Sequence, residues 1–143
     1  MTNTCAHGHR MVIPMDRVRV QHMLQDIETY CREAQEAARN VTQDTWDRWE
    51  KGGLAGLMDE RSRLSAVSPE YRQVSAALVI LHPYMDAWKI TAPYRGDILD
   101  SPADERLRLL ETVLSSFSRC TRISVADMRK HAYAFWPDAD GHV

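Results

Sequence analysis

The amino-acid sequence predicts an all-α fold, a helical bundle of about five helices that contains a helix-turn-helix-like pair. Apolar residues recur every three or four positions in several segments, and cap residues or prolines lie where those segments start. No segment alternates apolar and polar residues as a half-buried strand does. The chain has 143 residues, 44% hydrophobic and 27% charged, which is typical of one globular domain and not of a disordered chain.

The first predicted helix covers residues 16–39, as one long amphipathic helix or two in tandem. No Gly or Pro interrupts its apolar positions, which are Val20, Met23, Ile27, Tyr30, Cys31, Ala34 and Ala38. Asn40 then interrupts the pattern, because asparagine tolerates turn geometry well.

A short second helix is predicted over residues 42–51. Thr42 can cap its first turn, and Trp46 and Trp49 give it one apolar side. The Gly52-Gly53 pair is expected to end it, because glycine adopts positive φ at little cost.

The next stretch, residues 54–68, is expected to form a short helical turn followed by a linker. Ser68-Pro69-Glu70 then opens a third helix, with serine as the cap and proline in the first turn, and Pro83 lies just past its end. Its buried stripe consists of Tyr71, Val74, Leu78 and Leu81. In residues 84–100 the pattern is broken, and we expect one short helical turn around Trp88. The aromatic residues expected to pin this connection to the body are Tyr84, Trp88 and Tyr94.

Two more helices follow, one opened by Ser101-Pro102 and one by Ser124 and stopped at Pro137. The inward residues of the first are Leu107, Leu110, Leu114 and Phe117, and those of the second are Val125, Met128, Ala132 and Phe135. The predicted organisation is a flexible segment 1–15, a single helical domain 16–137 with possible sub-parts 16–67 and 68–137, and a flexible tail 138–143.

The most informative motif is VTQDTWDRWEKGGLAGLMDERSR, residues 41–63. It resembles the helix-turn-helix segment of transposases and integrases, and its first part is similar to the phage-repressor type, whose recognition helix often ends in W-E-x-G. The resemblance covers about residues 31–63 and implies a DNA-binding protein of bacterial, phage or mobile-element origin. The sequence departs from this pattern at Glu36, where those families commonly have alanine.

In a helix-turn-helix, the second helix packs its rear face on the first helix and presents the other face to the major groove. Trp46 and Trp49 are expected on the rear face. The outward residues, which the resemblance assigns to DNA contact, are Gln43, Asp44, Asp47, Arg48 and Lys51. Of these, the two aspartates can accept hydrogen bonds from cytosine but also repel phosphates.

A second candidate lies near the end of the chain, where basic residues are concentrated. Its cations, predicted to hold the phosphate backbone, are Arg119, Arg122, Arg129 and Lys130. The alternative interpretation is a solvated helix end whose cations favour the carbonyl dipoles.

The charge pattern leaves two functions open. Residues 32–72 contain seven basic and eight acidic side chains, whereas DNA-binding domains are usually basic. The first hypothesis is a DNA-binding regulator of transcription or recombination that binds double-stranded DNA as a homodimer. The alternative is a small helical protein-interaction module, such as an inhibitor, immunity or adaptor protein, in which the two-tryptophan helix is simply core.

No enzyme motif is found, so we expect neither catalysis nor a cofactor. Cys5, His7 and His9 form C-x-H-x-H, but their spacing does not suit a closed metal site, so none is expected. The cysteines are odd in number and have no CxxC pair, which predicts reduced thiols. No apolar run approaches the roughly 18 residues of a membrane helix, and the start lacks the apolar core of a signal peptide. We therefore expect a cytoplasmic protein without membrane contact.

Overall fold

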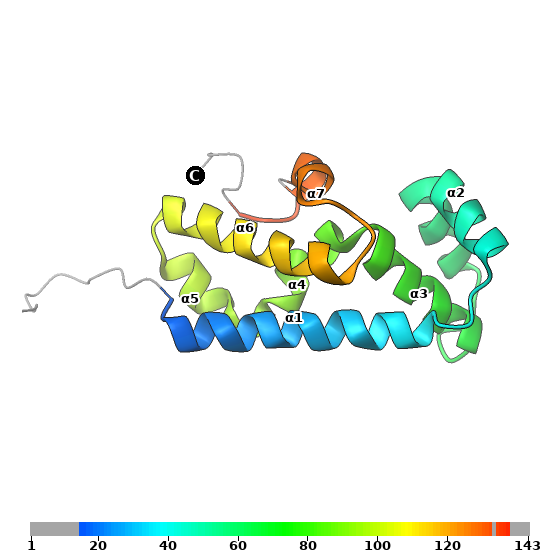
Figure 1. Cartoon of the computed structure of the whole chain (residues 1–143), viewed down its shortest axis with the longest axis horizontal. Coiled ribbons are helices and arrows are strands. Elements are labelled where there is room, and N and C mark those ends of the chain that lie inside the picture. The colour runs from blue at the N-terminus through cyan, green and yellow to red at the C-terminus, as the bar shows by residue number, and fades with distance from the viewer. Residues whose placement is uncertain (1–14, 133, 138–143) are drawn as a thin grey trace, which may run out of the picture.

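The computed structural model describes residues 15–132 and 134–137, and it confirms the all-α fold class. The described part contains seven α-helices, two short 3₁₀ helices and no strand (Figure 1). The α-helices are α1 (Arg17–Ala37), α2 (Gln43–Ser62), α3 (Pro69–Leu81), α4 (Ala87–Ile90), α5 (Arg95–Asp100), α6 (Ala103–Cys120) and α7 (Val125–Ala132). The 3₁₀ helices are η1 (Pro83–Asp86) and η2 (Ala92–Tyr94).

Helix α1 extends along the long axis of the molecule and is the element on which the others assemble (Figure 1). Helices α3 and α6 both pack on α1, and the short helices α4 and α5 fill the space between α1 and α6. Helix α7 packs on α6 and η1. Helix α2 lies at the far end of the molecule and packs on α3.

The main hydrophobic core lies between α1 and α6, as the periodicity predicts. Met23, Ile27 and Cys31 of α1 are completely buried there. Their neighbours from α6 and α7 include Leu110, Val113, Leu114, Phe117 and Met128. Tyr84 and Tyr94 are also buried in this core, so the connection between α3 and α6 is pinned by aromatic rings as expected.

Two smaller clusters join the rest of the molecule to α3. Trp49 and Leu57 of α2 pack against its residues Val74, Ala77, Leu78 and Leu81. On another side of α3, Ala34 and Ala38 of α1 pack against Ala76, Val79 and Ile80. Alanine on both helices lets α1 and α3 approach closely, because its side chain takes up little volume between the two helix backbones.

Two of the predicted helix starts are capped by the expected side chains, and Asp16 caps a third. The hydroxyl of Thr42 accepts a hydrogen bond from the backbone N–H of Thr45 at 3.3 Å, and that of Ser68 accepts from Tyr71 at 3.1 Å. The carboxylate of Asp16 accepts from the N–H of Arg19 at 2.9 Å. Each cap satisfies a donor that the first helical turn leaves without a partner.

The structure differs from the prediction where distant contacts decide the backbone. Gly53 adopts φ 69° and ψ −168° and breaks the helix as predicted, but a second helical part of α2 follows this kink and continues to Ser62, where one turn and a linker were expected. Residues 84–100 form four short helices instead of one turn. The N-cap residue of α6 is Pro102 and not Ser101 as predicted. The Ser101 hydroxyl instead donates to the carbonyl of Asp97 at 2.9 Å.

The remaining predictions concern cysteines, metals and membranes. Cys31 and Cys120 are free thiols, and burial next to Cys120 raises the pKa of Cys31 to about 12. Cys5, His7 and His9 lie outside the described residues. Within residues 15–132 and 134–137, no helix is long and apolar enough to cross a membrane.

Candidate functional site

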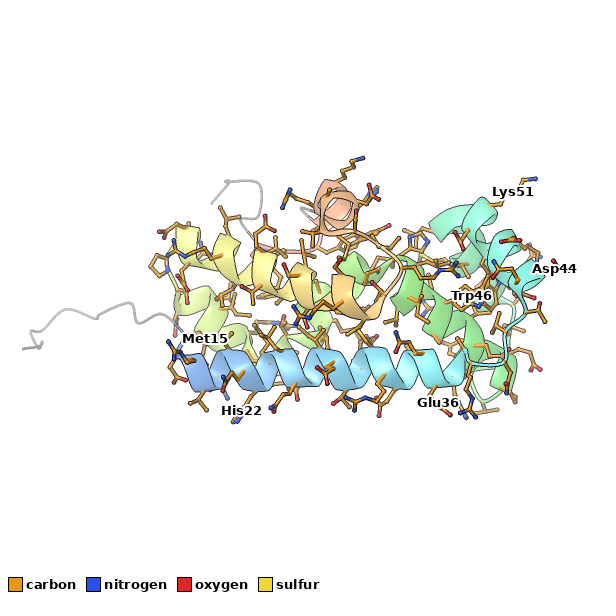
Figure 2. The ribbon with its side chains drawn as sticks, viewed as in Figure 1. Met15, His22, Glu36, Asp44, Trp46 and Lys51 are labelled. Atoms are coloured by element: carbon orange, nitrogen blue, oxygen red, sulfur yellow. The ribbon has the colours of Figure 1, made fainter. Side chains whose placement is uncertain are left out.

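The five α2 residues assigned to DNA contact all lie on the exposed side of the helix. Gln43, Asp44, Asp47, Arg48 and Lys51 are solvent-exposed, whereas Trp49 is 5% exposed. Asp44 and Lys51 point away from the body, and Trp46 lies on the side that faces the other helices (Figure 2). The two tryptophan rings meet edge to face, with their centroids 5.3 Å apart.

The helix that supports this face is α3, and not α1 as helix-turn-helix geometry requires. Trp49 contacts α3 residues, whereas α1 reaches the two-tryptophan segment mainly through the cluster of Ala34 and Ala38, against which Trp46 packs. The helix-turn-helix pairing predicted from residues 31–63 is therefore replaced by an α2–α3 pair.

Arg48 is committed to the internal structure of α2. Its guanidinium forms an ion pair with Glu60 at 2.6 Å, and the indole N–H of Trp49 donates to the same carboxylate at 3.4 Å. In an uninterrupted helix, residues 12 positions apart lie about 18 Å apart along the axis. The kink at Gly53 folds the two halves of α2 together, so that Glu60 reaches Arg48. The hydrogen bond from Arg48 lowers the pKa of Glu60, although desolvation opposes this shift.

The polar residue Gln43 is also engaged locally. Its side-chain amide donates to the Asp47 carboxylate at 2.8 Å, one helical turn further along. Of the five residues assigned to DNA contact, Asp44 and Lys51 therefore keep their polar groups free of partners among the described residues.

The structure brings the second candidate segment against the first. The guanidinium of Arg122 pairs with Glu50 of α2 at 3.2 Å and lies over the Trp46 ring, 5.2 Å from its centroid. The backbone N–H of Arg122 donates to the carbonyl of Ile80 at 3.2 Å, which fixes the α6–α7 loop on α3. We call the exposed side chains of residues 43–52 and 119–122 together the Trp46 face.

Two further basic residues of the second segment lie on α7, and both are paired with acidic residues. Arg129 binds Glu111 of α6 through two hydrogen bonds, at 2.9 and 3.1 Å. Lys130 lies 3.5 Å from the carboxylate of Asp127. Four of the six cations that the sequence assigned to DNA thus have acidic partners, and in the described part of the chain Lys51 and Arg119 have none.

A hollow of about 330 Å³ opens on the Trp46 face. Ala38 and Ile80 contribute apolar surface to it, and Trp46 stands beside Arg119 and Arg122 at its edge. The Gln35 side chain donates to the carbonyl of Cys120 and so joins α1 to the same place. The sequence indicated the cations of this face but not Gln35 and Glu50, whose partners lie in other elements, nor Glu60, which meets Arg48 only because of the kink at Gly53.

The groups of this face are suited to binding. No cluster of three or more potential metal ligands occurs among the described residues. The hollow brings together an indole ring, two guanidinium groups and apolar side chains, which can bind an apolar body and a carboxylate. Comparisons with family models, curated proteins and solved structures find no match to this chain.

Proposed function

We propose that the chain is a helical protein-interaction module that binds a partner protein through the Trp46 face. The observation that carries this proposal is the charge balance of the face and its surroundings. Arg48, Arg122, Arg129 and Lys130 are each neutralised by a carboxylate of the same chain. A DNA backbone is bound mainly through unneutralised cations that release its counterions, whereas a protein interface has no such requirement.

The hollow supports a protein partner by its composition. Tryptophan and arginine are the residues most enriched among interface side chains that contribute strongly to affinity. Trp46 is half-buried next to an apolar floor, and Arg119 stands at the rim without an acidic partner among the described residues. A partner segment that presents an apolar side chain to Trp46 and a carboxylate to Arg119 matches this arrangement.

Capture of the partner tests the proposal. We expect the tagged chain, incubated with nuclease-treated lysate of its source cells, to retain a protein that is lost with Arg119→Glu. Arg119 is exposed, so its charge can be reversed without disturbing the core. The matched control is Arg17→Glu, an equal charge change on the first turn of α1, at the other end of the molecule. Equal retention by both variants would remove the Trp46 face from the interaction.

DNA binding is the second candidate, and the exposure of the α2 edge favours it. Lys51 and Arg119 have no acidic partner in the described part of the chain, and the α6–α7 loop lies next to α2. In that case the chain is a regulator of transcription or recombination that acts as a homodimer. Arg48 then leaves its ion pair with Glu60 and contacts DNA instead.

A mobility-shift titration separates the two candidates. The protein-interaction proposal predicts that the wild-type chain does not shift a random-sequence duplex at about 150 mM salt, which is close to physiological ionic strength. A shift that weakens steeply with rising salt and disappears with Arg48→Ala and Lys51→Ala would instead establish DNA binding.

A further inference from the structure

A cavity of about 440 Å³ lies between α1 and α3, near the end of α2. Tyr30 of α1 and Ala76 of α3 are among its lining residues, and η1 and α4 contribute Asp86 and Lys89. It shares no lining residue with the hollow at Trp46. A ligand here would leave the Trp46 face open, and this inference is independent of the proposed function.

Three cations line this α1–α3 cavity: Arg61 from α2, Arg72 from α3 and Lys89 from α4. None of them forms an ion pair with a described residue, although this chain pairs most of its arginines. Arg19, Arg32, Arg39, Arg48, Arg63, Arg108, Arg122 and Arg129 all have acidic partners. Three unpaired cations from three elements at one cavity form a concentration of positive charge that an anion can neutralise.

The acidic residues of the cavity do not cancel this charge. Asp86 accepts a hydrogen bond from the Tyr30 hydroxyl at 2.8 Å, so one of its oxygens is already engaged. Burial, with the nearby Asp86 charge, raises the pKa of Tyr30, so that its hydroxyl stays protonated and keeps donating. Glu33 also lines the cavity and, like Arg72 and Lys89, is exposed to solvent, so three cations against two carboxylates leave a formal excess of one positive charge.

The position of Arg61 is fixed by an aromatic ring. Its guanidinium carbon lies 6.0 Å from the centroid of Tyr71, which also lines the cavity. A guanidinium held against a ring is partly pre-ordered and keeps its N–H groups for a planar oxyanion.

The part of the cavity wall formed by α1 and α3 contains small apolar side chains. Ala34 and Ala37 of α1 face Ala76 and Val79 of α3. Ligand sites of this kind combine an apolar wall with a few polar groups, and 440 Å³ lies at the lower end of their usual range of about 300–1,000 Å³.

We propose that the α1–α3 cavity binds a small organic anion with an aromatic or apolar body. The body lies between the alanine-lined walls of α1 and α3. Its carboxylate or phosphate is held by Arg61 with help from Lys89 and Arg72, while the Tyr30–Asp86 pair closes one side.

Fluorescence titration with 8-anilinonaphthalene-1-sulfonate, an aromatic anion, tests this proposal on the full chain. We expect Arg61→Gln with Lys89→Gln to weaken binding about tenfold, because charge-assisted hydrogen bonds to the anionic group are lost. Arg17→Gln with Arg108→Gln removes the same charge from two exposed arginines outside both the cavity and the Trp46 face, and is expected to bind like the wild type. Equal affinity of all three proteins would overturn the proposal, as long as their thermal midpoints agree.

Two further measurements guard against an unfolded variant and identify the anionic group. Ser75→Phe fills the cavity without changing its charge and is expected to weaken probe binding to a similar degree. Phenyl phosphate or phenylacetate is expected to displace the probe, and the more effective of the two identifies phosphate or carboxylate as the preferred group. Displacement by benzylamine at the same concentration, or by neither anion, would contradict the assignment.

Discussion

At the scale of single residues, His82 is a titratable side chain whose surroundings disfavour the protonated, charged imidazolium. Its Nδ1 lies 3.1 Å from the hydroxyl of Tyr84, and its Nε2 is buried without a hydrogen-bond partner among the described residues. The Tyr84 ring stacks on His131, with 4.7 Å between the ring centroids. Burial, and secondarily the charge of His131, lowers the pKa of His82.

This environment predicts a loss of stability on mild acidification. Below the ordinary His pKa of about 6.5 the unfolded chain binds a proton at His82, while the folded chain does not until the pH falls to its lower pKa. The free energy of unfolding therefore decreases as the pH falls through this window. We expect His82→Gln to reduce this decrease between about pH 7.5 and 5.5, an interval that spans the ordinary His pKa of about 6.5. Urea denaturation at each pH measures the free energy of unfolding.

The control for this prediction is His22→Gln, since His22 is exposed on α1 (Figure 2). It should leave the pH profile as in the wild type. Identical profiles of the His82 variant and the wild type would show that other groups cause the acid sensitivity.

At the scale of elements, the kink in α2 determines what the Trp46 face can do. Gly53 lies in a backbone region that is open essentially only to glycine, and it turns the chain so that Trp49 and Leu57 both contact α3. The same turn brings Glu60 to Arg48. A straight α2 would separate Glu60 from Arg48 and leave Arg48 without its partner.

Two glycine substitutions in α2 therefore have opposite expected effects. Gly53→Ala should destabilise the protein by about 1–3 kcal/mol, because alanine is strained at φ 69° although nothing crowds the new methyl group. Gly56→Ala should stabilise it by about 0.5–1 kcal/mol, because Gly56 is helical and its surroundings are also open. Thermal unfolding of both variants checks this, and a stabilised Gly53→Ala protein would exclude the kink.

The elements also show which features can be predicted from sequence. Caps such as Thr42 and Ser68 were predicted correctly, since a cap depends on residues within one turn. The continuation of α2 beyond Gly53 could not be predicted, because Leu57 is held by α3, a separate element. Residues 84–100 were misjudged for the same reason. Their short helices are supported by the burial of Tyr84, Tyr94 and Ile98 in the core between α1 and α6.

At the scale of the whole molecule, charge pairing is the observation that favours the protein-interaction proposal over DNA binding, and it could not be predicted from sequence. The periodicity of the two-tryptophan helix allows an exposed edge, although a core position was the alternative, and the structure shows that edge exposed. The pairing of Arg122 with Glu50, and of Arg129 with Glu111, joins different helices and depends on their packing. Sequence reasoning therefore identified where the cations are but not that four of the six are neutralised.

The three hydrophobic clusters predict that the molecule unfolds in one step. Helix α1 contributes Met23 and Ile27 to the main core and Ala34 and Ala38 to the cluster with α3, so neither sub-part keeps its packing without α1. The two halves also contain separate reporters: Trp46 and Trp49 on α2, and Trp88 and Trp136 in or beside the main core. A two-state protein gives coincident transitions for all such probes.

We therefore expect Trp46→Phe with Trp49→Phe, and Trp88→Phe with Trp136→Phe, each to give one midpoint by fluorescence and by far-UV circular dichroism. The comparison is made within each variant, because the substitutions themselves change stability. A fluorescence midpoint below the dichroism midpoint in the variant that keeps Trp46 and Trp49 would show that α2 and α3 open first. The Trp46 face would then be a locally unfolding element, and its partner would bind a conformation in which the Arg122–Glu50 pair is broken.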